Sequence, residues 1–111
     1  MESKIIEYAG NGITARVVVS AANVLQGMKR TRLRNAHGPL EKMPEEEVIA
    51  RVFTYPDLIA AAREIEISGL DDVPTFDQFV ALPEVLAIQW EEAVYALNPH
   101  WLPQADDEKK E

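Results

Sequence analysis

The chain has no cysteine among its 111 residues. It therefore cannot form a disulfide, a thiolate metal site, a redox pair or a cysteine nucleophile, and a reducing compartment suits it best. It also lacks an apolar run of about 18 residues, and residues 1–5 are not a basic region followed by an apolar stretch. These absences predict a protein of the cytoplasm that neither spans a membrane nor is secreted.

Motifs that carry chemistry are equally scarce. His37 and His100 stand without a second histidine or a carboxylate at metal-ligand spacing. No serine lies in a G-x-S-x-G setting, and Gly10-Asn11-Gly12 lacks the downstream glycine or lysine of a phosphate-binding loop. We therefore predict no catalytic residue, no cofactor and no metal site, and we do not expect an enzyme.

The composition is that of a folded protein, with 47% hydrophobic and 27% charged residues. The length fits one domain, which we place at residues 1–103. Residues 104–111 contain no large apolar side chain. We expect them to form a disordered tail of mixed charge.

The net charge of −8 is unevenly spread. Residues 1–40 carry six Lys or Arg and two acids, which gives +4, whereas residues 41–92 carry three Lys or Arg and thirteen acids, which gives −10. An acidic total argues against nucleic acid as a partner. The acidity either keeps the chain soluble or forms a surface that docks a basic partner, and both interpretations stay open.

Two β-branched runs flank Gly10-Asn11-Gly12, whose residues tolerate positive φ. This pattern predicts a β-hairpin over about residues 4–19. Ser20 can then cap a helix from about Ala21 to Leu33. The apolar stripe that we expect this helix to bury consists of Ala21, Val24 or Leu25, and Met28.

The end of this helix concentrates positive charge, in Lys29, Arg30, Arg32 and Arg34. Cations near a helix C-terminus complement its dipole and bind its last carbonyls. The same four residues could instead form a contact patch for another protein. We therefore take them as candidate protein-interaction residues.

A second helical region begins near Pro44, where three glutamates suit the positive end of a helix. Pro56 should break or kink it, because proline lacks a backbone donor. We expect a second piece from Asp57 to about Glu66, with Gly69 as its stop.

Two further helices have clear local signals. Thr75 and Gln78 match a capping box, which predicts a short helix through Val80 or Ala81. The last helix begins at Pro83-Glu84 and should end at Asn98-Pro99. Its buried stripe is Leu86, Trp90, Ala93 or Val94, and Leu97. Together these elements predict a mainly α fold, a small domain of about four helices with an N-terminal β-hairpin.

Aromatic residues cluster at the end of the last helix. Trp101, just beyond the helix stop, either folds back over the core as a lid or belongs to an interface, where aromatic residues are enriched. We add Tyr95 and Trp101 to the candidate protein-interaction residues.

Part of the chain resembles a known family. The segment Phe76-Asp77-Gln78-Phe79-Val80-Ala81-Leu82-Pro83-Glu84, then Trp90, then Ala93-Val94-Tyr95-Ala96-Leu97-Asn98-Pro99-His100-Trp101, is similar to tail assembly chaperones of long-tailed, siphovirus-type bacteriophages or prophages. Tyr55-Pro56-Asp57-Leu58 followed by an alanine-rich helix also resembles that family, so the likeness covers roughly residues 50–103.

The resemblance implies a mainly helical, non-enzymatic protein in the cytoplasm of a bacterial host. Such a protein coats the tape measure protein during tail building, recruits tail tube subunits and is absent from the finished particle. The charge asymmetry adds self-association to this expectation, since opposite charges on one chain suit a head-to-tail contact. The alternatives are a small cytoplasmic regulatory adaptor and a subunit of an enzyme complex.

Overall fold

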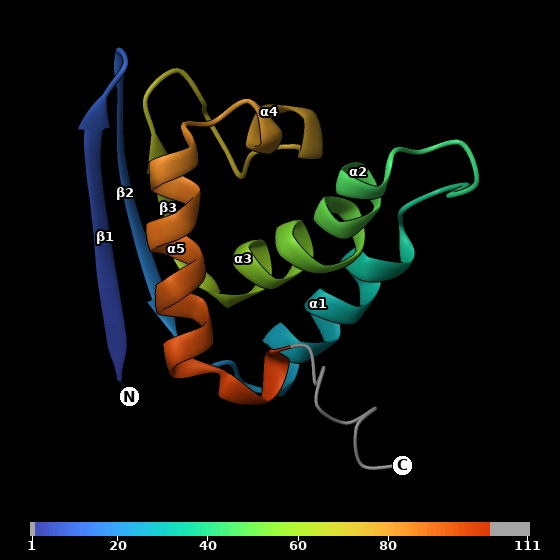
Figure 1. Ribbon diagram of the computed structural model, residues 1–111. Helices are drawn as coiled ribbons and strands as arrows, with labels where there is room; N and C mark the ends of the chain where they lie inside the picture. The colour runs from blue at the N-terminus through green and yellow to red at the C-terminus, as the bar shows by residue number, and fades with distance from the viewer. Residues whose placement is uncertain (1, 103–111) are drawn as a thin grey trace.

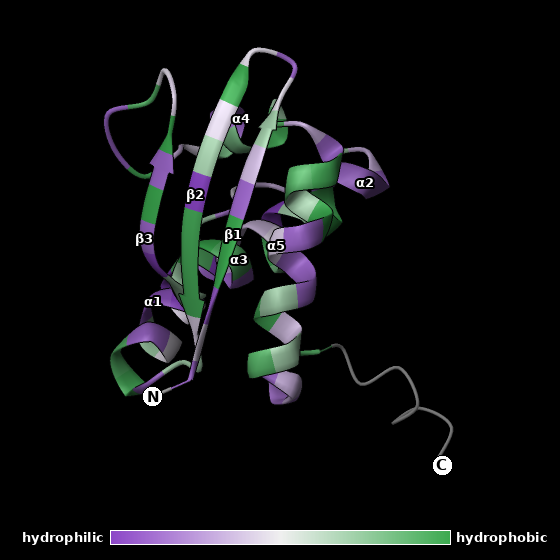
Figure 2. Ribbon diagram, turned by 90° about the vertical axis from the view of Figure 1, so that its left-hand side faces the viewer, coloured by the Kyte–Doolittle hydropathy of each residue, from purple (hydrophilic) through white to green (hydrophobic). Residues whose placement is uncertain are grey.

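A three-stranded antiparallel sheet forms one layer of the molecule. The computed structural model describes residues 2–102. The strand order is β1 (Ser3–Gly10), β2 (Ile13–Ser20) and β3 (Ala62–Ile67), so β2 is central. Helix α5 (Glu84–Leu97) lies along one face of the sheet (Figure 1). Within the described residues the opposite face carries no helix (Figure 2).

The predicted mainly α fold class is wrong, because the described residues are about 50% helical and 22% strand and β3 joins the hairpin in one sheet. We expected most of β3 to belong to a helix that ran to about Glu66, but α3 (Tyr55–Ala61) passes directly into β3. The run from Glu64 alternates acid and isoleucine, so Ile67 is buried while Glu64 faces solvent. Pairing with the free edge of β2 outweighs the helix propensity of alanine and glutamate.

The predicted hairpin is confirmed, and its strands extend slightly beyond residues 4–19. Its two-residue loop consists of Asn11 and Gly12, whose φ angles are 53° and 77°. Two positive φ angles define a type I′ turn, whose twist matches that of the flanking strands. Alternation along β2 then buries Val17 and Val19 in the core.

Helix α1 (Val24–Asn35) begins later than predicted. Ser20 does not cap it, because Ser20 ends β2 and is buried there. Asn23 caps the helix instead and forms a capping box with Gln26. The predicted buried stripe is also wrong, because no residue of α1 is buried.

The central helical segment does not break at Pro56. It runs through α2 (Glu45–Ile49), a π-helical turn η1 (Ala50–Thr54) and α3. Pro56 cannot donate a hydrogen bond to the carbonyl of Val52, four residues earlier. Arg34 supplies the missing donor, since its Nε donates to the Val52 oxygen at 3.0 Å.

The last two helices agree with the sequence. Thr75 forms the expected capping box at the start of α4 (Phe76–Val80), and α5 begins after Pro83 and ends before Asn98. The core is one cluster that includes residues of all three strands, α3, α4 and α5. Its largest members are Ile6, Val17, Val19, Leu58, Ile59, Ile67, Phe79, Leu86, Trp90, Val94 and Trp101. The tail predicted at residues 104–111 lies outside the described residues.

Candidate functional site

The four cations of α1 differ in their surroundings. Arg30 forms a salt bridge to Asp57, with 2.5 Å between Nε and Oδ1. Arg34 lies against the π turn through the hydrogen bond described above. Within residues 2–102, Lys29 and Arg32 form no salt bridge. The predicted patch is therefore divided into two cations that bond to other parts of the chain and two that form no salt bridge there.

A buried carboxylate organises the end of the molecule where α1, α3 and α5 meet. The Asp57 side chain is 1% exposed. Its Oδ1 accepts from Arg30 and its Oδ2 accepts from the Tyr95 hydroxyl at 2.5 Å. The Arg30 guanidinium also lies 4.6 Å from the centre of the Trp101 ring. Three candidate interaction residues thus converge on one internal ion pair, and Trp101 packs back on the core as a lid.

This environment fixes the protonation of Tyr95. Burial raises the pKa of Tyr95 far above its ordinary value, and the hydrogen bond to Asp57 adds to the effect. The phenol therefore stays neutral and donates its proton to a fixed acceptor. A group in this state holds the structure in place and cannot act as a base or nucleophile at neutral pH.

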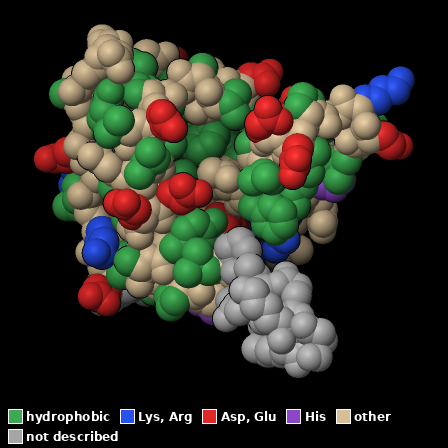
Figure 3. All heavy atoms as spheres, viewed as in Figure 1, with side chains coloured by type: hydrophobic (Ala, Val, Ile, Leu, Met, Phe, Trp, Pro, Cys, Tyr) green, Lys and Arg blue, Asp and Glu red, His purple; other side chains and the backbone are tan. Residues whose placement is uncertain are grey.

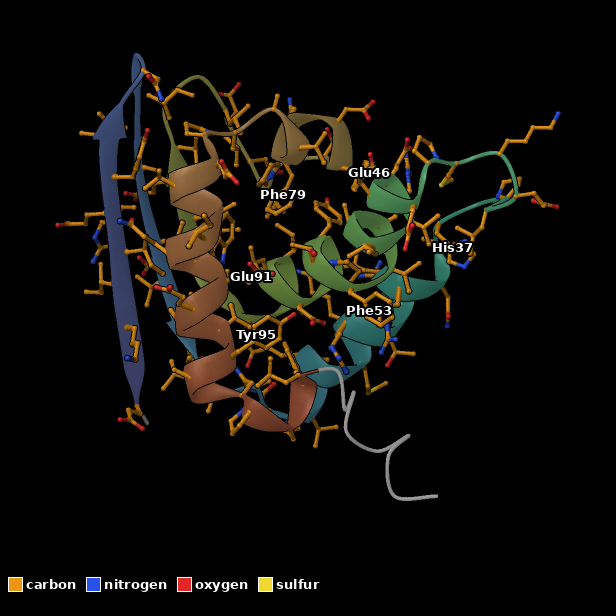
Figure 4. The ribbon with its side chains drawn as sticks, in the orientation of Figure 1. His37, Glu46, Phe53, Phe79, Glu91 and Tyr95 are labelled. Carbon is orange, nitrogen blue, oxygen red and sulfur yellow. The ribbon has the colours of Figure 1, made fainter. Side chains whose placement is uncertain are left out.

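A groove of about 660 Å³ opens between the segment that carries the π turn and α5. We call it the acidic groove. It is lined by Ile49, Phe53, Thr54, Ile88, Glu91, Glu92, Tyr95 and Leu102. Figure 3 shows hydrophobic side chains gathered around a hollow on this face, with acidic side chains near its edge. In Figure 4, Glu91 and Tyr95 point from α5 toward the segment of Phe53.

The groove concentrates negative charge. Burial raises the pKa of Glu91, and the neighbouring charges of Asp57 and Glu92 raise it further. Asp57 is neutralised by Arg30, but Glu91 and Glu92 form no salt bridge within the described residues. A cation that entered the groove would relieve this repulsion, so the groove favours a basic ligand.

Sequence reasoning found one lining residue of the groove, Tyr95. It missed the others because Ile49 and Ile88 belong to ordinary amphipathic helices, and a single sequence does not show which apolar residues stay exposed. It also missed Asp57, which resembles any acidic residue in the first turn of a helix. The uneven charge was the available signal, since it placed the acids in residues 41–92.

Residues 2–102 contain no group of three or more acidic or histidine side chains that could hold a metal ion. None of the helices in this part of the chain has the length and hydrophobicity that crossing a membrane requires. No family model, curated protein or solved structure matches the chain.

Proposed function

We propose that the chain is a non-enzymatic protein-binding protein whose acidic groove holds an apolar, basic segment of a partner. In the setting that the sequence resemblance implies, it is a tail assembly chaperone of a long-tailed phage. Its partners are then the tape measure protein and the tail tube subunits, which it brings together in the cytoplasm of the host.

The composition of the acidic groove carries this proposal. Ile49, Phe53 and Ile88 provide an apolar surface, and Ile49 and Ile88 are 48% and 44% exposed to solvent. Contiguous exposed apolar surface with a polar rim is typical of interaction sites. Glu91 and Glu92 add a charge preference, which selects partners with Lys or Arg beside their apolar side chains.

The same groove suits a small molecule or a reaction poorly. Small-molecule sites present a few convergent polar groups that orient the ligand. Here the Tyr95 hydroxyl is already bonded to Asp57, and the carboxylates of Glu91 and Glu92 stand next to an apolar wall. This arrangement favours a protein segment over a substrate.

Gene context and co-purification test the proposal. We expect genes for a tail tube and a tape measure protein beside the gene for this chain, and we expect that tape measure protein to co-purify with the chain. Ile88→Glu places a third carboxylate in the groove and should abolish co-purification. Val85→Glu, on the same helix but outside the groove lining, is the control and should keep it.

Metabolic genes on both sides would overturn the phage assignment. Co-purification that survives Ile88→Glu, in a variant that remains folded, would overturn the role of the groove.

A further inference from the structure

A second apolar surface lies on α1. Val24, Leu25 and Met28 are 81%, 74% and 63% exposed. They follow one another along one side of the helix, since residues four apart share a face. Lys29 and Arg32 line one hollow together with Met28, and Arg32 lines a second hollow with it. We call these five residues the α1 surface.

The α1 surface cannot turn inward to bury itself. Arg30 ties the middle of α1 to Asp57, and Asn98 accepts a hydrogen bond at 2.7 Å from the backbone of Ala22, just before the helix. The helix is therefore held at both places with its apolar side toward solvent. A fixed, exposed apolar surface with a positive rim is suited to a partner.

The two surfaces are complementary in charge. The α1 surface presents Lys29 and Arg32, which form no salt bridge within the described residues, and the acidic groove presents Glu91 and Glu92, which lack one there too. Both surfaces have an apolar centre, so their contact would remove apolar area from water and bring opposite charges together.

Their positions prevent the contact within one molecule. In Figure 2, α1 lies at the lower left and α2 at the upper right, with α5 between the centre and the right-hand side. The acidic groove lies between the segment that begins with α2 and α5. One copy therefore carries the two surfaces on different sides, and only a second copy can bring them together.

We propose that copies of this chain associate head to tail, with the α1 surface of one copy seated in the acidic groove of the next. Such a contact is heterologous, so it closes into a ring or continues as a chain. This inference goes beyond the proposed function and does not depend on the identity of the partner. Because the partner segment and the α1 surface of the neighbouring copy bind the same groove, a bound partner segment displaces the neighbouring copy.

Complementation between two variants tests the contact. Met28→Glu destroys the α1 surface and leaves the groove intact, whereas Ile88→Glu destroys the groove and leaves the α1 surface intact. In sedimentation velocity, we expect the native chain to form concentration-dependent oligomers and each variant to be a monomer. An equimolar mixture of the two variants should form a 1:1 dimer and stop there, because the remaining surfaces are the damaged ones.

Val85→Glu, which adds the same charge outside both surfaces, should associate as the native chain does. Circular dichroism and the melting temperature verify that each variant is folded. Higher salt should weaken the native association, since exposed charges are screened.

Three results would overturn the inference. The first is a native chain that stays monomeric up to about 1 mM. The second is an Ile88→Glu chain that still dimerises, which would indicate a contact between the α1 surfaces of two copies. The third is an equimolar mixture of the two folded variants that stays monomeric. The proposed function fails separately, if Met28→Glu, whose groove is intact, does not bind the tape measure protein.

Discussion

At the scale of single residues, one buried acid decides what the cations of α1 do. The sequence shows four cations in six positions as a uniform patch. In the fold, Arg30 forms a salt bridge to Asp57, and Arg34 donates a hydrogen bond to the Val52 carbonyl, which Pro56 leaves without its helical donor. These partners lie far away in the sequence, so no local pattern could separate the four cations.

We predict that Arg30→Met lowers the free energy of unfolding by about 3–5 kcal/mol, because it leaves the Asp57 carboxylate buried without a cation. Arg32→Met is the control, and it should change stability by less than about 0.5 kcal/mol because Arg32 is exposed. Urea denaturation measures both variants.

Adding Asp57→Asn to Arg30→Met should recover part of the loss, since a neutral amide needs no counter-charge. Equal effects of Arg30→Met and Arg32→Met would contradict the assigned role of the ion pair.

At the scale of elements, the sequence was informative wherever the signal was local. The Asn11-Gly12 turn, the Thr75 capping box and the limits of α5 are set by neighbouring residues, and each was predicted. The third strand was missed because α3 enters β3 at Ala62 without a glycine, a proline or a loop. Its strand conformation depends on pairing with β2. In that pairing Ala62 lies opposite Val19, which is more than 40 residues earlier in the chain.

Asn98 joins the end of α5 to the end of β2 and the start of α1, which lie more than 70 residues earlier in the chain. Its side-chain amide donates to the carbonyls of Ser20 and Val94 at 3.1 Å, and its side-chain oxygen accepts from Ala22 at 2.7 Å. The sequence identified Asn98 as a helix stop, but not as the link between the end of β2, the start of α1 and the end of α5.

We predict that Asn98→Ala lowers the free energy of unfolding by about 1–3 kcal/mol, because it leaves buried or half-buried backbone groups without partners. Asn35→Ala, at the exposed end of α1, should change it by less than about 0.5 kcal/mol. Thermal and urea denaturation measure the difference, and an Asn98→Ala chain as stable as the native one would show that water replaces these bonds at no cost.

At the scale of the whole molecule, the fold pairs only some of the N-terminal cations with acidic residues of the same chain. The N-terminal cations Arg16 and Arg30 form salt bridges to acids within the chain. Lys29 and Arg32 on one side, and Glu91 and Glu92 on another, form no salt bridge within residues 2–102. The charge counts showed that the two parts of the chain differ in charge, whereas which charged residues lack an internal partner required the fold.

The most direct test of the account is an NMR titration of the Met28→Glu chain, which keeps the groove but should not self-associate, with the tape measure protein that we propose as its partner. The account predicts chemical-shift changes concentrated at Phe53, Ile88 and Glu91 of the acidic groove. Changes confined to the open face of the sheet, at Arg16 and Val18, or no changes at all, would contradict it.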